Sequence, residues 1–138
     1  MLNLLENVTE ISVADMKADV RNPGKFLFVY TYDPDYAPHL YVEKDGSGYT
    51  GAWFLGCTHG YERCSHVVVF FHPKRQGRAH LYRGAVERIV ILRPEEHNHK
   101  DRLPRHRVYF KHFKLCGYST KGWSDFWGER RAQPTRVA

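Results

Sequence analysis

Two pairs of side chains with zinc-ligand chemistry lie close together in the chain, Cys57 with His59 and Cys64 with His66. Cysteine thiolates and histidine imidazoles are the usual ligands of structural zinc. One residue separates the members of each pair, so on an extended strand they point to opposite sides, whereas structural zinc sites usually have about two to four residues between the first two ligands. We therefore assign no metal ligand and expect no cofactor.

Patterns typical of catalytic sites are missing from the sequence. It has no glycine-rich phosphate loop ending in Lys-Ser or Lys-Thr, no G-x-S-x-G and no H-E-x-x-H. His112 and Cys116 share a face of a predicted strand but have no third group to orient them. We expect a protein that is not an enzyme. A small nuclease or other RNA-processing enzyme remains an alternative, and it would use the following side chains: His66, His72, His80 and Arg83.

Aromatic and basic residues are both abundant. The 138 residues include 14% aromatic side chains and carry a formal net charge of +6. Residues 1–70 have 5 basic and 9 acidic side chains, and residues 71–138 have 16 and 6, so the positive charge lies in the second half. Rings stack on bases and cations bind phosphates, so this composition favours nucleic acid as the partner, although a basic surface that only aids solubility has the same composition.

Basic side chains cluster after the most apolar segment of the chain. Lys74, Arg75 and Arg78 lie in a predicted turn, with Arg83 on the strand that follows. We predict that these four contact the phosphate backbone. Alternating cations further along the chain either extend this basic stripe or only face solvent; they are Arg105, Arg107, Lys111 and Lys114.

Trp53 is a candidate pocket residue because glycines flank it at a junction between a loop and a strand. Small neighbours allow a ligand or a backbone segment to approach a large ring. The alternative is that Trp53 only fills the hydrophobic core.

The order of short motifs around Trp53 resembles a known family. W-x-x-G at Trp53–Gly56, V-x-x-F-x-H at Val67–His72 and R-G-x-V at Arg83–Val86 look like the EVE branch of PUA-like domains, over roughly residues 25–115. The resemblance implies a small β-barrel with short helices and an aromatic pocket that receives a modified or flipped base. It assigns the following residues to that pocket: Tyr30, Tyr32, Trp53, Gly56, Phe70, Phe71 and His72.

Hydrophobic periodicity predicts the elements that position these residues. Ser12 followed by Asp15 indicates the start of a short helix that ends before Pro23. An Asp-Gly turn at 45–46 predicts a hairpin between 39–43 and 49–55, or else a long ordered loop. Gly84 indicates a bulge or a close backbone approach. The remaining strands are predicted at 25–32, 66–72, 79–92 and 106–115, with a loop at 93–104.

These elements predict an α+β fold, a small and mostly antiparallel PUA-like β-barrel with one or two short flanking helices. We expect one domain over 1–128 and a frayed basic tail over 129–138. A last helical turn at 124–127 would cover one end of the barrel or contact nucleic acid directly.

An odd count of three cysteines indicates reduced thiols, and no apolar run approaches the roughly 20 residues that span a bilayer, so we expect a cytoplasmic protein with no membrane partner. The function that these observations favour is a nucleic-acid-binding module that reads a modified or flipped base, in DNA or RNA, with a possible nuclease partner on a separate chain. The alternative is a protein–protein interaction module, such as an inhibitor of a nucleic-acid-binding protein.

Overall fold

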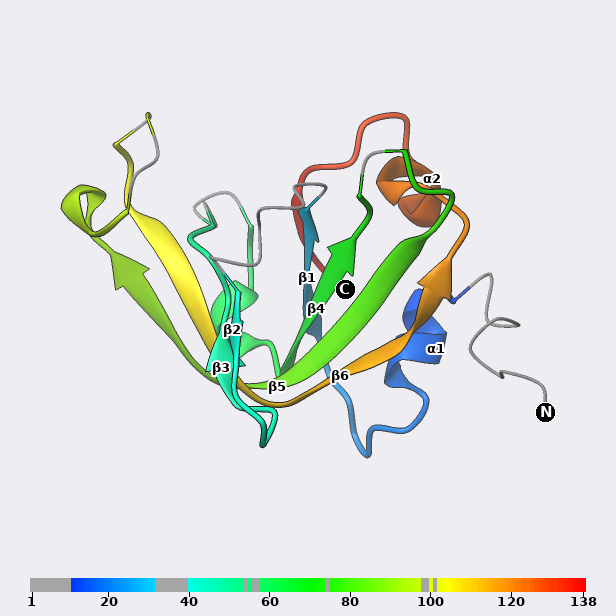
Figure 1. Cartoon of the computed structure of the whole chain (residues 1–138), viewed down its shortest axis with the longest axis horizontal. Helices are drawn as coiled ribbons and strands as arrows, with labels where there is room; N and C mark the ends of the chain where they lie inside the picture. The colour runs from blue at the N-terminus through cyan, green and yellow to red at the C-terminus, as the bar shows by residue number, and fades with distance from the viewer. Residues whose placement is uncertain are drawn as a thin grey trace.

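The computed structural model describes residues 11–31, 40–53, 55, 58–73, 75–97, 100 and 102–138. Within them the chain forms a seven-stranded mixed sheet with two short α-helices, which confirms the α+β class (Figure 1). The elements are α1 (Val13–Lys17), β1 (Phe26–Thr31), β2 (Tyr41–Val42), β3 (Gly48–Tyr49), η3 (Tyr61–Arg63), β4 (His66–Phe71), β5 (Ala79–Leu92), η4 (Pro94–Glu96), β6 (Arg105–Ser119), α2 (Trp123–Trp127) and β7 (Thr135–Val137).

The strand order is β2-β3-β6-β5-β4-β1-β7. β1 pairs with β4 in parallel, and the other neighbours are antiparallel. In the described part of the chain β2 and β7 are the two edges and do not pair with each other, so the sheet is open and barrel closure is not shown.

The long hairpin of β5 and β6 gives the sheet its curved shape. Both strands bend, so that one end of the hairpin lies near α1 and α2 and the other end extends away from them (Figure 1). The register between the strands shifts at three places, one of them between Arg83 and Ala85. A Cβ on Gly84 would lie 3.0 Å from the Phe110 side chain, so Gly84 provides both the bulge and the close approach that the sequence predicts.

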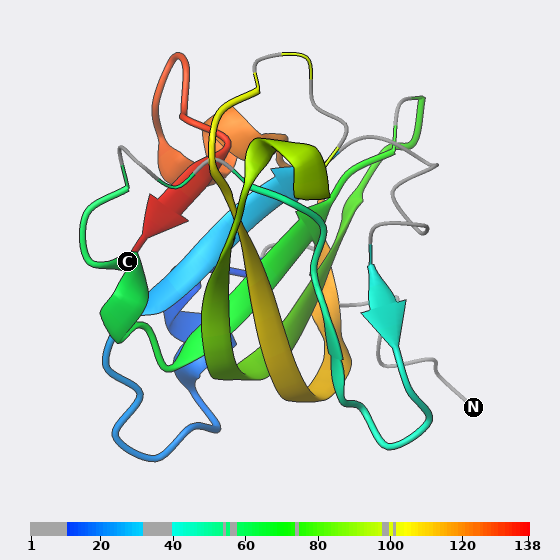
Figure 2. The ribbon, with the colours of Figure 1, turned by 90° about the vertical axis from the view of Figure 1, so that its left-hand side faces the viewer.

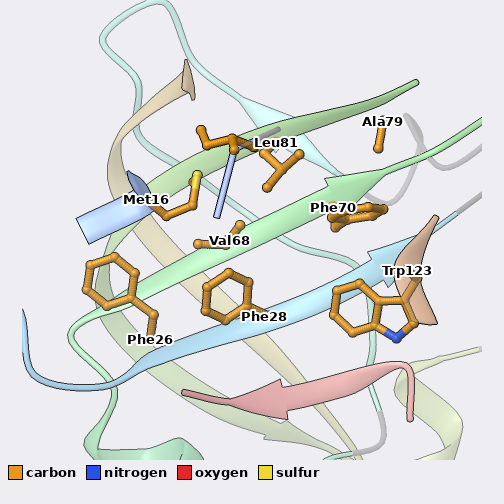
Figure 3. Packing of buried hydrophobic residues seen from close by; sticks show 9 residues of the cluster. Met16, Phe26, Phe28, Val68, Phe70, Ala79, Leu81 and Trp123 are labelled. Atoms are coloured by element: carbon orange, nitrogen blue, oxygen red, sulfur yellow. The ribbon is translucent and has the colours of Figure 1, made fainter. Parts of the chain in front are cut away.

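Both faces of the sheet carry a hydrophobic cluster. β4 contributes Val68 and Phe70 to the cluster under α1 and α2, and Val67 and Val69 to the opposite cluster, because successive side chains of a strand point to opposite faces. Figure 3 shows the first of these clusters, with Trp123 of α2 packed against it. β4 is therefore buried on both faces of the sheet.

The two α-helices form where the sequence predicts them. Ser12 caps α1 in a reciprocal capping box with Asp15, and the fully buried Met16 anchors this helix to the sheet. α2 ends at Gly128, whose φ of 67° is a conformation that glycine adopts readily. Neither they nor any other helix of the described residues is both long and apolar enough to cross a membrane.

The C-terminal residues correct one prediction. We expected 129–138 to be frayed, but β7 pairs with β1, and Phe26 and Ala138 exchange backbone hydrogen bonds of 2.7 and 3.0 Å. The backbone N–H and C=O groups along the outer edge of β1 need partners, and the C-terminal segment supplies them. The predicted hairpin is present as the short strands β2 and β3, which are two residues long each.

Candidate functional site

The predicted base-pocket residues do not come together in one pocket. Phe70 is fully buried in the cluster under the α-helices, and Tyr30 stacks on Trp123 there with ring centroids 5.5 Å apart. Trp53 and Phe71 pack against the cluster on the opposite face of the sheet. The sequence motif combined side chains that strand geometry sends to opposite faces, and this grouping is therefore corrected.

The structure does not bring the remaining predicted pocket residues together with these rings. The His72 ring lies in the turn after β4, where its Nε2 is 2.9 Å from the carbonyl oxygen of Gln76. Tyr32 and Gly56 lie outside the described residues.

Trp53 nevertheless lines a pocket. Its backbone forms an isolated antiparallel bridge with His106 at the start of β6, with N–H···O distances of 2.8 and 2.7 Å. Beside this bridge is an open pocket of about 540 Å³. Its walls come from three separate parts of the chain and consist of Trp53, Thr58, His59, Arg105, Glu129, Gln133, Pro134, Thr135, Arg136 and Val137.

The pocket combines one large ring with charged and hydrogen-bonding groups. The Arg105 guanidinium donates to the carbonyl oxygen of Ala52 at 3.3 Å, which holds it next to Trp53. Arg136 is ion-paired with Glu129 and lies 4.5 Å above the Trp127 ring. The pocket lining therefore combines an aromatic residue, one arginine held by a backbone carbonyl and one arginine–glutamate ion pair.

A buried histidine supports the Trp53 bridge. His106 is 6% exposed, and its Nε2 is 2.9 Å from the hydroxyl of Tyr61. Burial lowers the pKa of His106 below its ordinary value, which favours the neutral imidazole near pH 7. The His106 ring thus joins β6 to η3, while its backbone forms the bridge with Trp53.

Arg83 has a packing role in place of the predicted phosphate contact. Its guanidinium donates to both carboxylate oxygens of Asp19, at 2.6 and 3.0 Å, and to the carbonyl oxygen of Met16 at 2.7 Å. The Arg83 side chain is only 9% exposed, and this ion pair holds the pKa of Asp19 well below its usual range. These contacts use Arg83 to attach α1 and its C-terminal end to the sheet, so this prediction is corrected.

The other predicted phosphate ligands lie in the turn between β4 and β5. Arg75 is exposed, and Arg78 lies 4.4 Å above the Tyr118 ring. Neither lines the Trp53 pocket, and Lys74 lies outside the described residues.

The four cations of the possible basic stripe are used differently. Arg105 lines the pocket and Arg107 stacks on Tyr49. Lys111 pairs with Glu87 at 3.7 Å, and Lys114 with Asp19 at 3.2 Å.

The described members of the two cysteine–histidine pairs are not grouped as a metal centre. Burial raises the pKa of the Cys64 thiol to about 11, and the His66 ring is hydrogen-bonded to Ser65 at 2.8 Å. Among the residues that the structure describes, no three His, Cys, Asp or Glu side chains are grouped so that they could hold a metal ion. Cys57 lies outside this part of the chain.

The residues of the nuclease alternative divide between the two ends of β4. His66 begins β4 and His72 follows its last residue, which separates them by roughly 20 Å of extended strand. His80 pairs in register with Phe71 and so lies at the His72 end, while His66 lies at the other end.

Sequence reasoning missed the wall of the pocket that residues 133–137 supply. Polar and apolar residues alternate over Thr135, Arg136 and Val137, as they do in a strand. Three residues are too few to establish a hydrophobic period. The chain was compared with known protein families, curated proteins and solved structures, and none of them matches it. A functional assignment therefore depends on the geometry of its own side chains.

Proposed function

We propose that this protein is a nucleic-acid-binding module that accepts one modified or flipped base in the Trp53 pocket. The observation that carries the proposal is that one tryptophan and two arginines, Trp53, Arg105 and Arg136, line the same open hollow. A volume of about 540 Å³ lies within the range of roughly 300–1,000 Å³ that is common for small-ligand sites.

Each part of the pocket has a matching part in a nucleotide. An extruded base gains roughly 1–3 kcal/mol by stacking on an aromatic ring, which offsets the few kcal/mol that unstacking costs. Arg105 can donate to a phosphate or to acceptor atoms of a base. Arg136 and Glu129 pair with each other at the rim, so a ligand would meet them as one ion pair.

The resemblance to the EVE branch of PUA-like domains, with its closed barrel, belongs to the same proposal. In it the protein binds without catalysis of its own, acts in the cytoplasm and leaves cleavage to a nuclease on a separate chain. Arg75 and Arg78 remain candidates for backbone phosphates outside the pocket. The open hollow beside Trp53 favours base binding over a protein-interaction module, for which a filled core and a flat aromatic surface would suffice.

The proposal is tested with short oligonucleotides that carry cytosine, methylcytosine, hydroxymethylcytosine or methyladenine, titrated at two salt concentrations. We expect the parent protein to discriminate among them and Trp53→Ala to lose this discrimination while keeping most of its salt-sensitive affinity. Trp53→Phe is the matched control, because it keeps a ring at the same position.

Thermal unfolding is measured for each variant, because a truncated core tryptophan costs about 3–5 kcal/mol of stability. A folded Trp53→Ala protein with full discrimination contradicts the pocket assignment. Equal affinity of the parent for every base contradicts base recognition itself.

A further inference from the structure

Three tyrosines form a row across three neighbouring strands. Tyr41 of β2 pairs in register with Tyr49 of β3, which pairs with Tyr109 of β6. The ring centroids of Tyr41 and Tyr49 are 5.4 Å apart with the planes inclined by 23°, and those of Tyr49 and Tyr109 are also 5.4 Å apart. Tyr41 is 46% exposed, so the row reaches the solvent.

Two arginines lie on this row. The Arg88 guanidinium is 4.2 Å from the centroid of the Tyr109 ring, and that of Arg107 is 4.8 Å from the centroid of Tyr49. Among the residues that the structure describes, neither arginine is in an ion pair, whereas Arg83, Arg93 and Arg136 all are. Stacking on rings thus holds Arg88 and Arg107 in place and leaves their charges uncompensated by any described ion pair.

The row lies on the face of the hairpin that the α-helices do not cover. Val108 and Phe110 of β6 point into the cluster that also contains Val67 and Val69, so Arg107 and Tyr109, which alternate with them, point to the opposite side. Both α-helices pack at the far end of the sheet, on the cluster that contains Phe70. Figure 2 shows this end of β5 and β6 facing the viewer, with β2 beside it.

We infer that this tyrosine–arginine face, formed by Tyr41, Tyr49, Arg88, Arg107 and Tyr109, binds single-stranded nucleic acid. The exposed ring of Tyr41 and the half-buried rings of Tyr49 and Tyr109 take the flat faces of unstacked bases, and guanidiniums take the phosphates between them. A duplex hides its base faces in its own stack, so it cannot use the rings in this way.

This inference rests on the proposed function and adds a second binding surface to it. Arg107 and Tyr109 point away from Val108 and Phe110, whereas Trp53 bridges His106 and packs against the cluster that contains Val108. The Trp53 ring and the tyrosine–arginine face therefore lie on opposite faces of the sheet, so each can be tested without the other.

The experiment uses labelled single-stranded RNA and DNA of mixed sequence, and duplexes of equal length, at two salt concentrations. We expect the parent protein to prefer the single strands. Tyr109→Ala should weaken single-strand binding by about ten- to a hundredfold, the range for one lost stacked base, and Tyr109→Phe should bind as the parent does.

A second variant tests the charges without removing a ring. Arg88→Gln with Arg107→Gln should lower the salt slope of binding by about 1.4, the value for two lost phosphate contacts on a single strand. Arg21→Gln is the matched control, since Arg21 is exposed beyond α1 and touches no part of the face. If Tyr109→Ala fails to fold, Tyr41→Ala replaces it at the exposed end of the row.

The two proposals fail in different ways. Equal binding of duplex and single strand by the parent, or single-strand affinity unchanged in a folded tyrosine variant, overturns the tyrosine–arginine face. Binding of a single modified nucleoside monophosphate, measured by isothermal titration calorimetry, reports on the pocket. Its loss in Trp53→Ala and its retention in Tyr109→Ala supports the two sites as separate.

Discussion

Arg83 and Arg107 belong to the same β5–β6 hairpin, yet they have opposite surroundings. Arg83 is buried against Asp19 and the carbonyl oxygen of Met16, at the end of the hairpin that α1 covers. Arg107 lies on a tyrosine ring at the end that neither α-helix covers. An arginine on a strand therefore becomes a structural cation or a candidate ligand-binding cation according to which element packs over it.

The aromatic residues differ between the two ends in the same way. At the covered end Tyr30 and Phe70 pack around Trp123 in a filled core. At the uncovered end Tyr41 and Tyr49 stack on each other at the surface. A high aromatic content therefore arises here from two separate causes, core packing and an exposed row of rings.

The largest loss of stability should come from Phe70→Ala, at the end of the sheet that the α-helices cover. Because Phe70 is fully buried, its truncation should cost about 3–5 kcal/mol of the free energy of unfolding. Urea denaturation measures this loss. Surface substitutions usually cost less than about 1 kcal/mol. A loss this small for Phe70→Ala would show that Phe70 is not part of the core.

Asp19→Ala should have a smaller effect, on the order of 2–3 kcal/mol, because it leaves the buried Arg83 charge without its carboxylate. At the same time the affinity of the folded variant for single strands should stay unchanged. Denaturation and oligonucleotide titration of one preparation test both statements. Weaker strand binding by a fully folded variant would show that the covered end takes part in the interface.

The smallest effect concerns the pH dependence of stability. Burial lowers the pKa of His106 below its unfolded value of 6.5, so the unfolded chain binds more protons than the folded one as the pH falls through 6.5. Stability should therefore decrease below pH 6.5, by at most about 1.4 kcal/mol per pH unit from this group, until the folded pKa is passed. His66 and His80 shift in the same direction and add to the slope.

The Asp19 contribution should be lost in a different pH range. The folded pKa of Asp19 is lowered from 3.8, so the stability that it provides is present above pH 3.8 and is lost only as the pH falls further. Denaturation midpoints of the parent and of His106→Gln between pH 2 and 8 separate the two groups. An unchanged slope in His106→Gln would assign the pH dependence to the other histidines.

Local patterns predicted most of the elements of this fold. The capping box at Ser12, the apolar run at 66–71 and the long strand at 79–92 all formed as predicted. These features depend on neighbours within a few residues, so the sequence carries their signal directly. The strand predicted at 106–115 extends over 105–119, since pairing with β5 continues through the shifts in register.

The grouping of the site residues could not be predicted in this way. Phe70 and Phe71 are adjacent in the sequence and belong to different hydrophobic clusters. The sequence predicts Arg83 as a phosphate ligand, but in the fold it pairs with Asp19, which lies 64 residues earlier in the chain. Such partners are far apart in sequence, and no local period encodes them.

The sequence by itself determined most of the secondary structure, the basic second half and the abundance of rings, because propensity, charge and composition are properties of the residues. The tertiary structure alone decided which rings and cations face outward. The parallel pairing of β1 with β4, the C-terminal strand β7 along β1 and the Trp53–His106 bridge all join distant segments. The physical reason is that exposure depends on what packs over a side chain, and the covering elements α1, α2 and β7 reach their places only when the sheet forms.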